Sequence, residues 1–436
     1  MRRLLTYHCL PVLAVTGALA LLLAGGVAGG PRGPVPAAGP APAHAADRLT
    51  DRVARAQDRL RALPRDWSTW AALAAAYVEQ ARVTANPTYY QKAEGAARRS
   101  LELRPDGNTD ALVALGALAN ARHDFATARD QARAALAVDG YSADAYGVLA
   151  DALTQLGDAA GATDAVQHML DLKPGLAAYA RASYDLELRG RTAEAEELMR
   201  QARSAAVDPH DLAFCATQLG DLAWQRGDLA AAGREYATGL AADPDSVALR
   251  RGKAQVDAAT GDMTAALAGY AGITRRAPTP GYLLEYADLL RAAGRTADAG
   301  AQLGLARDAL DLFAANGGVD GLAAAALAIA TGKPADAVAA ARAEWARRQH
   351  VDVADTLAWS LHAAGQDTEA LGYARRVADT GARQAGYAYH LGAIEAALGL
   401  RDAARADLTR ALSTNPYFSP VEAPMARQLL GWVGPG

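Results

Sequence analysis

The sequence predicts an all-α protein built as a solenoid of helical repeats, and three observations support this. Its 436 residues are 51% hydrophobic but only 6% aromatic. Alanine, the strongest helix former, is the commonest residue, whereas the β-branched and aromatic residues that favour strands are scarce. A helix-turn-helix pattern also recurs through residues 67–416. Such a period is typical of a stacked array rather than of several globular domains.

The first 46 residues differ in composition from the rest. Basic residues precede an apolar run, and no acidic residue occurs before Asp47. This profile is typical of a secretory signal, so we expect residues 1–29 to form a signal peptide or a signal anchor. If the segment is not cleaved, residues 10–27 are long enough to tether the chain to a membrane. Residues 30–46, rich in Pro, Gly and Ala, predict a stiff linker.

Export from the cytoplasm, to the cell envelope or the medium, is therefore the expected localisation. Removal of the signal would also remove Cys9 and leave Cys215 as the lone cysteine. An intrachain disulfide is then impossible, and packing alone must stabilise the fold. The formal net charge of -4 lacks the basic footprint of a nucleic-acid binder, so no nucleic-acid partner is expected.

A glycine in a tight turn marks the middle of each repeat. The series is spaced by 33 to 38 residues and comprises Gly157, Gly190, Gly227, Gly261, Gly294, Gly332, Gly365 and Gly399. Glycine closes a helix in the left-handed conformation without a Cβ penalty. A proline or glycine then ends the second helix of most units, as at Pro105, Gly140, Pro174, Pro209, Pro244, Pro278 and Pro416. Each unit is therefore expected to be helix, turn, helix, turn.

Small residues in the second helix of each unit let the paired helices approach closely. They are Ala128, Ala162, Ala232, Ala266, Ala337, Ala370 and Ala404. A single unit cannot bury its apolar faces, so neighbouring units must stack into one core. We expect an N-terminal capping helix over residues 47–66, about ten repeats over 67–416 and a C-terminal capping segment over 417–436.

These residues resemble the tetratricopeptide repeat (TPR) family, whose eight-position signature is met in several units. One unit supplies Leu112, Leu115, Gly116, Ala119, Ala128, Ala132, Ala135 and Gly140, and the next Tyr146, Leu149, Ala150, Leu153, Ala162, Val166, Met169 and Pro174. The last unit supplies Ala388, Leu391, Gly392, Ala404, Leu408, Ala411 and Pro416. The resemblance implies a right-handed superhelix of about ten repeats that covers nearly all of the chain after residue 46.

Three units depart from this pattern. The first carries about seven extra residues near 83–90, between its helices, which would form a partner-binding loop or a tolerated insertion. The seventh extends its second helix to about Ala314. The eighth is alanine-rich with few large apolar residues, so the region between these two units is expected to act as a flexible joint.

In this family the first helix of each unit lines a concave groove that binds a peptide or a helix of another protein. The positions expected to face that groove are Tyr184, Asp221, Trp224, Arg251, Gln255, Asp288, Arg291, Trp359, His362 and Tyr389. Trp, Tyr and Arg are enriched at binding hot spots. The alternative for Trp224 and Trp359 is that each completes the core between units. The sequence leaves the partner's identity and the oligomeric state open.

No catalytic or cofactor-binding motif stands out. The chain lacks a phosphate-binding glycine loop and a zinc-type histidine pair, and Cys215 has no obvious base beside it. We therefore expect a non-catalytic scaffold or adaptor without a cofactor. The alternative function is a small-ligand or metal-binding accessory protein, for which His350, Asp352 and Asp355 are the best candidate ligands.

Overall fold

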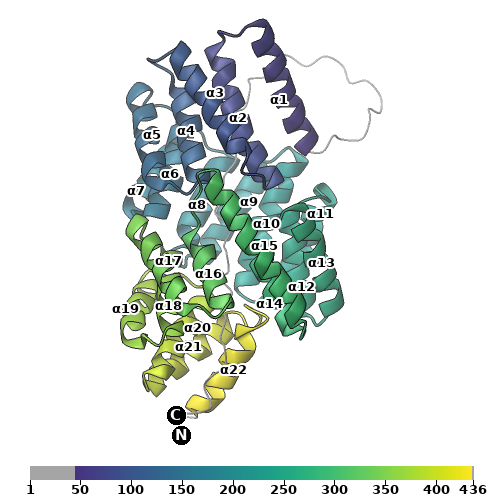
Figure 1. The fold of residues 1–436 in the computed structure, drawn as a ribbon, viewed down its shortest axis with the longest axis vertical. Helices are drawn as coiled ribbons and strands as arrows, with labels where there is room; N and C mark the ends of the chain where they lie inside the picture. The colour runs from purple at the N-terminus through teal and green to yellow at the C-terminus, as the bar shows by residue number, and fades with distance from the viewer. Residues whose placement is uncertain (1–44, 435–436) are drawn as a thin grey trace.

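The computed structural model describes residues 45–434, and all the regular elements in that range are α-helices (Figure 1). Helix α1 (Ala45–Ala62) comes first, ten helical pairs follow, and α22 (Glu422–Val433) ends the array. The predicted fold class, an all-α solenoid of helical repeats, is confirmed. The signal predicted for residues 1–29 and most of the linker predicted for 30–46 lie outside the described residues.

The ten pairs are numbered here as units 1 to 10. Units 1 to 5 are α2 (Trp67–Thr84) with α3 (Tyr89–Leu103), α4 (Thr109–Ala121) with α5 (Phe125–Val138), α6 (Ala143–Leu156) with α7 (Ala159–Leu172), α8 (Leu176–Glu187) with α9 (Thr192–Ala205), and α10 (Pro209–Gln225) with α11 (Leu229–Ala242). Units 6 to 10 are α12 (Val247–Ala259) with α13 (Met263–Arg276), α14 (Pro280–Ala292) with α15 (Thr296–Ala315), α16 (Gly321–Ala330) with α17 (Pro334–Arg347), α18 (Val351–Ala363) with α19 (Asp367–Asp379), and α20 (Ala385–Ala397) with α21 (Arg401–Thr414).

The turn inside most units is closed by a glycine. Gly157 takes a φ of 84° at the end of α6, and the other seven glycines of the series have φ between 70° and 95°. The left-handed backbone predicted for this series is confirmed. The next residue often begins the second helix: Asp158 accepts a hydrogen bond from the backbone N–H of Gly161 at 2.9 Å. An aspartate in this position satisfies an N–H that the first turn of the helix leaves free.

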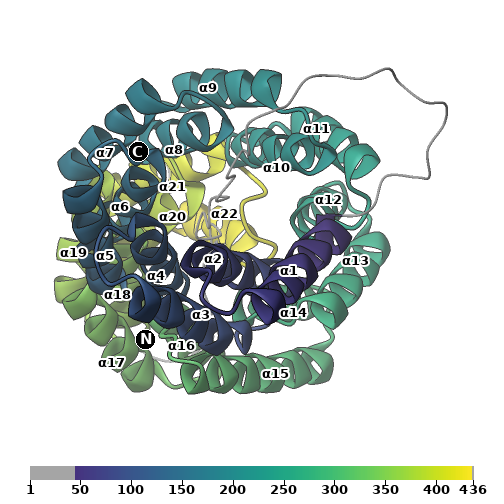
Figure 2. The same cartoon turned by 90° about the horizontal axis from the view of Figure 1, so that it is seen from above.

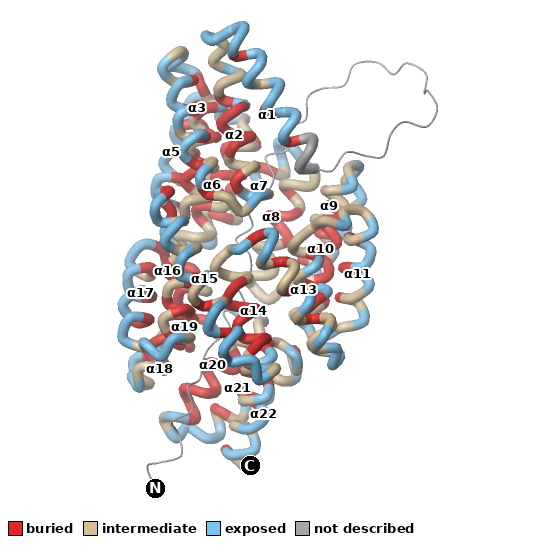
Figure 3. Tube along the Cα trace, turned by 45° about the vertical axis from the view of Figure 1, so that its right-hand side comes forward, coloured by how far each residue is buried: buried red, intermediate tan, exposed pale blue. Residues whose placement is uncertain are grey.

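Alanine builds the contact between the two helices of each unit. All seven alanines predicted to lie at close-contact positions are no more than 2% exposed. Figure 3 shows buried residues running between the helices, with exposed residues on the outer surface and at the helix ends. The second helix of each unit also packs on the first helix of the next, so the core continues from unit to unit.

The units wind into a right-handed superhelix. Seen from the end at which α1 lies, the chain runs clockwise as it recedes from the viewer (Figure 2). The even-numbered first helices lie nearer the axis, and the odd-numbered second helices lie outside them. The path exceeds one turn, so α4 to α7 lie over α16 to α19 (Figures 1 and 2).

Successive turns of the superhelix touch along a line of contacts that we call the seam. The seam joins the turn inside one unit to the loop that follows the unit five places later. Arg122 Nε, in the turn of unit 2, donates to the Asn316 carbonyl oxygen at 3.0 Å, and the Val319 N–H donates to the Arg122 carbonyl oxygen at 3.1 Å. In unit 3, the Leu156 carbonyl oxygen accepts from the Gln349 N–H at 3.4 Å.

The same step is repeated further along the seam. A Cβ placed on Gly190, in unit 4, would lie 2.1 Å from the Gly381 carbonyl oxygen, so the two backbones meet directly. In unit 5, the Trp224 carbonyl oxygen accepts from Asn415 Nδ2 at 2.7 Å. The four steps of the seam are therefore in phase with the repeat.

The stretch between units 7 and 8, for which the composition suggested a flexible joint, is a seam contact. Asn316 and Val319 both bond to Arg122, and Val319 also accepts a bond from His123 Nδ1 at 3.0 Å. These bonds tie the stretch to unit 2. The stretch expected to be a flexible joint is therefore held in place. Its hydrogen bonds come from residues of unit 2, which are far away in sequence.

Candidate functional site

The ten residues predicted to face the groove all lie on first helices. They are Tyr184 on α8, Asp221 and Trp224 on α10, Arg251 and Gln255 on α12, Asp288 and Arg291 on α14, Trp359 and His362 on α18, and Tyr389 on α20. These helices are the ones nearer the axis (Figure 2). The structure does not gather the ten into one site, because they are spread along units 4 to 10.

Most of the charged members of this set bond to neighbouring side chains. Arg251 donates to both carboxylate oxygens of Glu285, one unit further on, with Nε 2.9 Å from Oε2 and Nη2 2.9 Å from Oε1. Arg291 reaches Asp288 at 3.2 Å, and Asp221 accepts from the Tyr236 hydroxyl at 2.7 Å. The first and third of these bonds join two helices, whereas Arg291 and Asp288 both lie on α14. The polar groups of these side chains are therefore largely engaged within the fold.

Trp359 and Tyr389 do not face the groove. This corrects the expectation for Tyr389 and, for Trp359, supports the alternative that it completes the core. They are 3% and 2% exposed and belong to the core of units 8 to 10. The Trp359 ring stacks on His390 with ring centroids 4.1 Å apart, and on His362 with centroids 4.8 Å apart. The next first helix covers this side of α18, so a position that faces outward in an isolated unit is buried in the array.

Trp224 and Tyr184 are only partly buried. Trp224 packs against the core of units 5 and 6, whereas Tyr184 lines a cavity. Burial raises the pKa of Tyr184 well above its usual value, with a further contribution from the carboxylates of Asp352 and Glu187. The Tyr184 hydroxyl is therefore a neutral hydrogen-bonding group at physiological pH.

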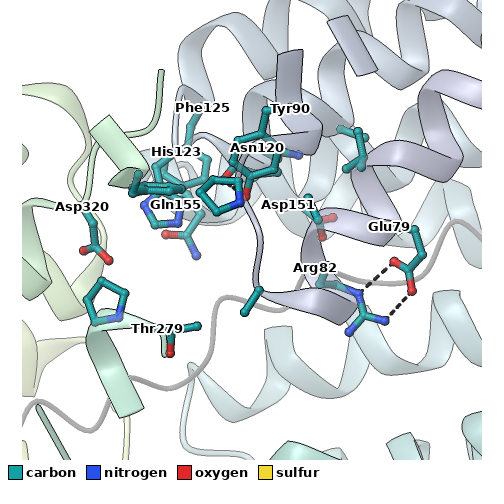
Figure 4. A pocket seen from close by; sticks show the side chains of 18 of the residues that line it. Glu79, Arg82, Tyr90, Asn120, His123, Phe125, Asp151, Gln155, Thr279 and Asp320 are labelled. Atoms are coloured by element: carbon teal, nitrogen blue, oxygen red, sulfur yellow. Dashed lines mark hydrogen bonds and ion pairs between the residues drawn. The ribbon is translucent and has the colours of Figure 1, made fainter. Parts of the chain in front are cut away.

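The cavity holds about 550 Å³ and lies between the first and second turns of the superhelix (Figure 4). Helices α2, α4, α6 and α8 form one wall. The opposite wall consists of α15 and the loop at residues 278–280. This volume lies within the range of ligand pockets in proteins.

The cavity occupies the place of a missing seam contact. The turn of unit 1, with Ala85 and Pro87, faces the loop after unit 6, with Pro278 and Thr279, and both line the cavity. In units 2 to 5 the equivalent turn touches the equivalent loop. The seam therefore opens at this step and leaves room for a ligand.

Both large departures from the repeat pattern meet at this cavity. The insertion expected between the helices of unit 1 mostly lengthens α2, which has 18 residues, and leaves a connection of only four residues at 85–88. This region contributes Ala85, Pro87 and Tyr90. The extended end of α15 contributes Leu312 and Phe313, and α15 has 20 residues where most other second helices have 14. Sequence reasoning identified both departures but not their proximity, because 220 or more residues separate them in the chain.

Seventeen of the 28 lining residues are apolar or aromatic and eleven are polar or charged, and several of the polar groups have specific partners. Arg82 Nε donates to Glu79 Oε2 at 2.8 Å, which neutralises both charges (Figure 4). Asn120 Nδ2 donates to the Val148 carbonyl oxygen at 3.1 Å. The Asn120 Oδ1 atom is buried and has no hydrogen-bond partner among the described residues.

His123 closes one end of the cavity. It stands where most other units have the turn glycine, with a φ of 60°. Its ring lies against Phe125 and Phe313, with centroids 5.6 Å and 5.3 Å away. Burial lowers its pKa, so the ring is neutral and its Nδ1–H donates to Val319. His123 therefore links the turn of unit 2 to the aromatic wall of the cavity.

The three candidate metal ligands do not converge. Asp352 contacts His350 at 3.4 Å, but Asp355 points to His390 instead, with both its oxygens 2.9 Å from His390 Nδ1. Within residues 45–434 no group of three or more His, Cys, Asp or Glu side chains is arranged to hold a metal ion. The predicted cluster is therefore wrong as a metal site.

Cys215 is fully buried in α10, and burial raises the pKa of its thiol to about 12. A thiol in this state is a poor nucleophile at neutral pH. None of the described helices is long and apolar enough to cross a membrane. Residues 10–27, the predicted tether, lie outside the described range.

Comparison with known proteins finds likeness at the level of overall structure only. No protein-family model matches the sequence, and no curated protein matches it either. Among solved structures, the chain is similar to the APC/C hetero-tetramer Cut9-Hcn1, with 13% identity, coverage of 89% of this chain and 90% of that chain, and a TM-score of 0.41.

Two further similar structures are of bacterial proteins. A tetratricopeptide repeat protein from Parabacteroides merdae is 17% identical, with 59% of this chain and 98% of that chain covered and a TM-score of 0.36. A thermophilic TPR protein from Thermus thermophilus is 20% identical, with 39% and 91% covered and the same TM-score. Because these likenesses are weak, the assignment depends on the repeated signature and the stacked pairs of this chain itself. The chain is a right-handed α-solenoid of ten tetratricopeptide-like repeats.

Proposed function

We propose that the protein is a non-catalytic scaffold that binds an extended segment of a partner protein along its inner wall, with an apolar side chain of that segment anchored in the cavity. The main support for this proposal is that the two departures from the repeat pattern, in unit 1 and at the end of α15, meet at the cavity. A seam that is closed at four successive steps opens at this one, and apolar side chains form much of the lining of the opening.

The polar groups of the cavity support a peptide as the occupant. The Glu79–Arg82 pair in the lining offers a peptide both donors and acceptors. A mostly apolar pocket with a few such groups fixes the orientation of its ligand. The exposed fractions of Leu305 and Leu312, 49% and 48%, provide apolar surface beside the cavity for further residues of the segment.

We also propose that the scaffold acts outside the cytoplasm, carried there by residues 1–29 and either released or tethered through residues 10–27. The support is the composition of the N-terminal segment. Mass spectrometry of the N-terminus of the protein purified from the envelope and from the medium tests this. A chain that is recovered only from the cytoplasm would contradict it.

Filling the cavity tests the binding site. Ala309 lines the cavity on α15, whereas Ala297 is exposed on the same helix and does not line it. A random library of 15-residue peptides is selected on the wild-type protein. We expect the selected peptides to bind Ala309→Trp at least about tenfold more weakly, a loss of about 1.4 kcal/mol. They should bind the control Ala297→Trp as well as they bind the wild type.

Two outcomes would contradict the proposal. One is a selection that yields no binding peptide, and the other is a set of peptides that bind Ala309→Trp and the wild type equally. Thermal unfolding of both variants shows whether each remains folded. The alternative function, binding of a small apolar molecule, uses the same cavity volume. A molecule that raises the melting temperature of the wild type but not of Ala309→Trp, without any peptide binding, would favour that alternative.

A further inference from the structure

The seam leaves two edges of the superhelix uncovered. The first, which we call the loop edge, consists of the loops after units 1 to 5, and it lies at the end where α1 is found. The second, the turn edge, consists of the turns inside units 6 to 10, at the end where α22 is found. Inside the molecule, edges of these two kinds fit together at four successive steps.

The loop edge carries exposed apolar side chains at the repeat spacing. Val138 and Tyr141, after unit 2, are 46% and 83% exposed, Leu172, after unit 3, is 37% exposed, and Val207, after unit 4, is 94% exposed. A row of this kind, with one step per unit, differs from the scattered single apolar residues that are normal on a protein surface.

The turn edge has the same backbone geometry as the turns already used in the seam. Gly157 and Gly190 have positive φ and press against residues of a distant loop. Gly294 and Gly365 have the same φ, within a few degrees of Gly190, but within the described residues nothing lies within 4 Å of the position of their Cβ. Leu400, in the turn of unit 10, is 41% exposed.

We propose that copies of this chain associate head to tail, with the turn edge of one copy seated on the loop edge of the next. The proposal rests on continuity with the seam: the contact between copies repeats the contact that each copy already makes within itself. Edges of two different kinds meet, so the interface is heterologous and the assembly grows by addition of further copies.

The terminal helices fix the register of this assembly. Helix α22 contacts α20 and α21 in the way that each first helix contacts the preceding unit, and α1 contacts α2 in the way that each second helix contacts the following unit. When two copies share one axis, α22 of the first and α1 of the second take the two places of one helical pair. The repeat of the assembly is then eleven units.

In this register the apolar residues of the two edges face each other. The seam joins a turn to the loop five units later, so the turns of units 7 to 10 meet the loops after units 1 to 4 of the next copy. The turn that contains Leu400 meets the loop that contains Val207. The loops that carry the exposed apolar residues, those after units 2, 3 and 4, are all covered.

Substitutions on the two edges test this arrangement in the full chain. The first variant, Tyr141→Arg with Val207→Arg, alters the loop edge, and the second, Gln366→Arg with Leu400→Arg, alters the turn edge. In sedimentation velocity experiments we expect the mass of the wild type to rise with concentration beyond that of a dimer. Each variant should associate at least about tenfold more weakly, because charges are buried without partners at the contact.

Mixing the two variants provides the decisive observation. Each variant keeps one intact edge, so a mixture should form a one-to-one dimer that grows no further. Ala301→Arg, on the exposed surface of α15, is the control and should associate like the wild type. Circular dichroism shows whether each chain remains folded.

Three results would overturn the proposal. They are a wild-type chain that stays monomeric up to about 100 µM, an assembly that stops at a dimer, and association that persists unchanged in both edge variants. The last result would assign the association to another surface, such as residues 10–27, which all the variants share. Peptide binding to the cavity is measured separately, so failure of one proposal leaves the other standing.

Discussion

Two stretches of the wall between successive superhelical turns are built from the same repeat but are filled differently. Between unit 1 and the loop after unit 6 there is a cavity of about 550 Å³. Between unit 4 and the loop after unit 9, Gly190 and Gly381 lie so close that no Cβ fits between them. Two local changes meet at the cavity, the lengthened α2 of unit 1 and the extended α15 of unit 7. Units built on the same pattern can therefore either touch across the seam or enclose a cavity.

The polar groups along the inner wall differ in the same way. Near the C-terminus, His390 lies between Asp355 and Glu422, with its Nδ1 2.9 Å from Asp355 and its Nε2 3.3 Å from Glu422. All three side chains are almost fully buried. At the N-terminal cavity, the buried Asn120 Oδ1 atom has no partner among the described residues. Buried atoms without a partner among the described residues also occur near the C-terminus, as at Trp359 Nε1 and Glu395 Oε2. What distinguishes the C-terminal region is therefore the paired charges around His390.

The largest expected effect comes from removing His390. Burial opposes a charge on this ring, but the two carboxylates outweigh it and raise the pKa of His390 to about 10. His390→Ala would remove the cation that lies between the buried carboxylates of Asp355 and Glu422. We expect the free energy of unfolding to fall by about 3–5 kcal/mol, as for other broken buried ion pairs. Urea unfolding at pH 7, followed by circular dichroism, measures the loss.

The pH dependence of the same variant supplies a second test. A pKa raised from 6.5 stabilises the folded state fully below pH 6.5, and this contribution is lost as the pH rises toward 10. The wild type should therefore lose stability over this range, and His390→Ala should not show that loss. His168→Ala, on an exposed part of α7, should change the free energy of unfolding by less than about 1 kcal/mol. An equal loss in both variants would contradict a special role for the His390 cluster.

The next effect compares a covered turn with an open one. Gly190→Ala and Gly294→Ala both place a Cβ in a left-handed turn, which costs about 1–2 kcal/mol in each case. In Gly190→Ala the new Cβ also meets the Gly381 carbonyl oxygen, whereas Gly294 has open space among the described residues. We expect Gly190→Ala to lose about 1–3 kcal/mol more, the usual cost of overpacking.

Urea unfolding of the two glycine variants, together with small-angle X-ray scattering, makes the comparison. A larger radius of gyration for Gly190→Ala alone would show that the seam has opened. Equal stabilities and equal radii would mean that the seam adds nothing to the fold, and that successive turns only touch.

The helical pairs were predictable from sequence because their determinants are local. Gly157 and Asp158 close a turn by themselves, and Ala162 packs within its own unit. The seam was not predictable, because Arg122 and Asn316 meet only after small rotations accumulate over five units. The sequence left open whether Trp359 faces the groove or completes the core, because its cover comes from the next unit, which its own helix pattern does not reveal.

The cavity was predictable from the sequence only in part. Its two distinctive walls were visible in the sequence as an insertion near residues 83–90 and a long second helix ending near Ala314. Their meeting depends on the pitch of the superhelix, which no single repeat encodes. The sequence around Glu79, Arg82 and Asn120 therefore did not indicate that these residues line a cavity.

A further pH-dependent effect comes from Glu187, at the end of α8. Its carboxylate accepts from Gln225 Nε2 at 2.6 Å, and burial raises its pKa from 4.5 to about 7, with a smaller contribution from Asp221 and Asp352. The folded state therefore binds the proton more tightly than the unfolded state. Between pH 4.5 and about 7 the free energy of unfolding should fall as the pH rises, by at most about 1.4 kcal/mol per pH unit for this group.

Glu187→Gln removes this titration and keeps a hydrogen-bonding group of the same shape beside Gln225. The variant should gain stability relative to the wild type as the pH rises from 4.5 to about 7. Glu197→Gln, on the exposed side of α9, should follow the wild type at every pH. If the Glu187→Gln curve is parallel to the wild type, then water reaches this carboxylate freely. The inner wall at unit 4 would then be open like the cavity, rather than filled like the region around His390.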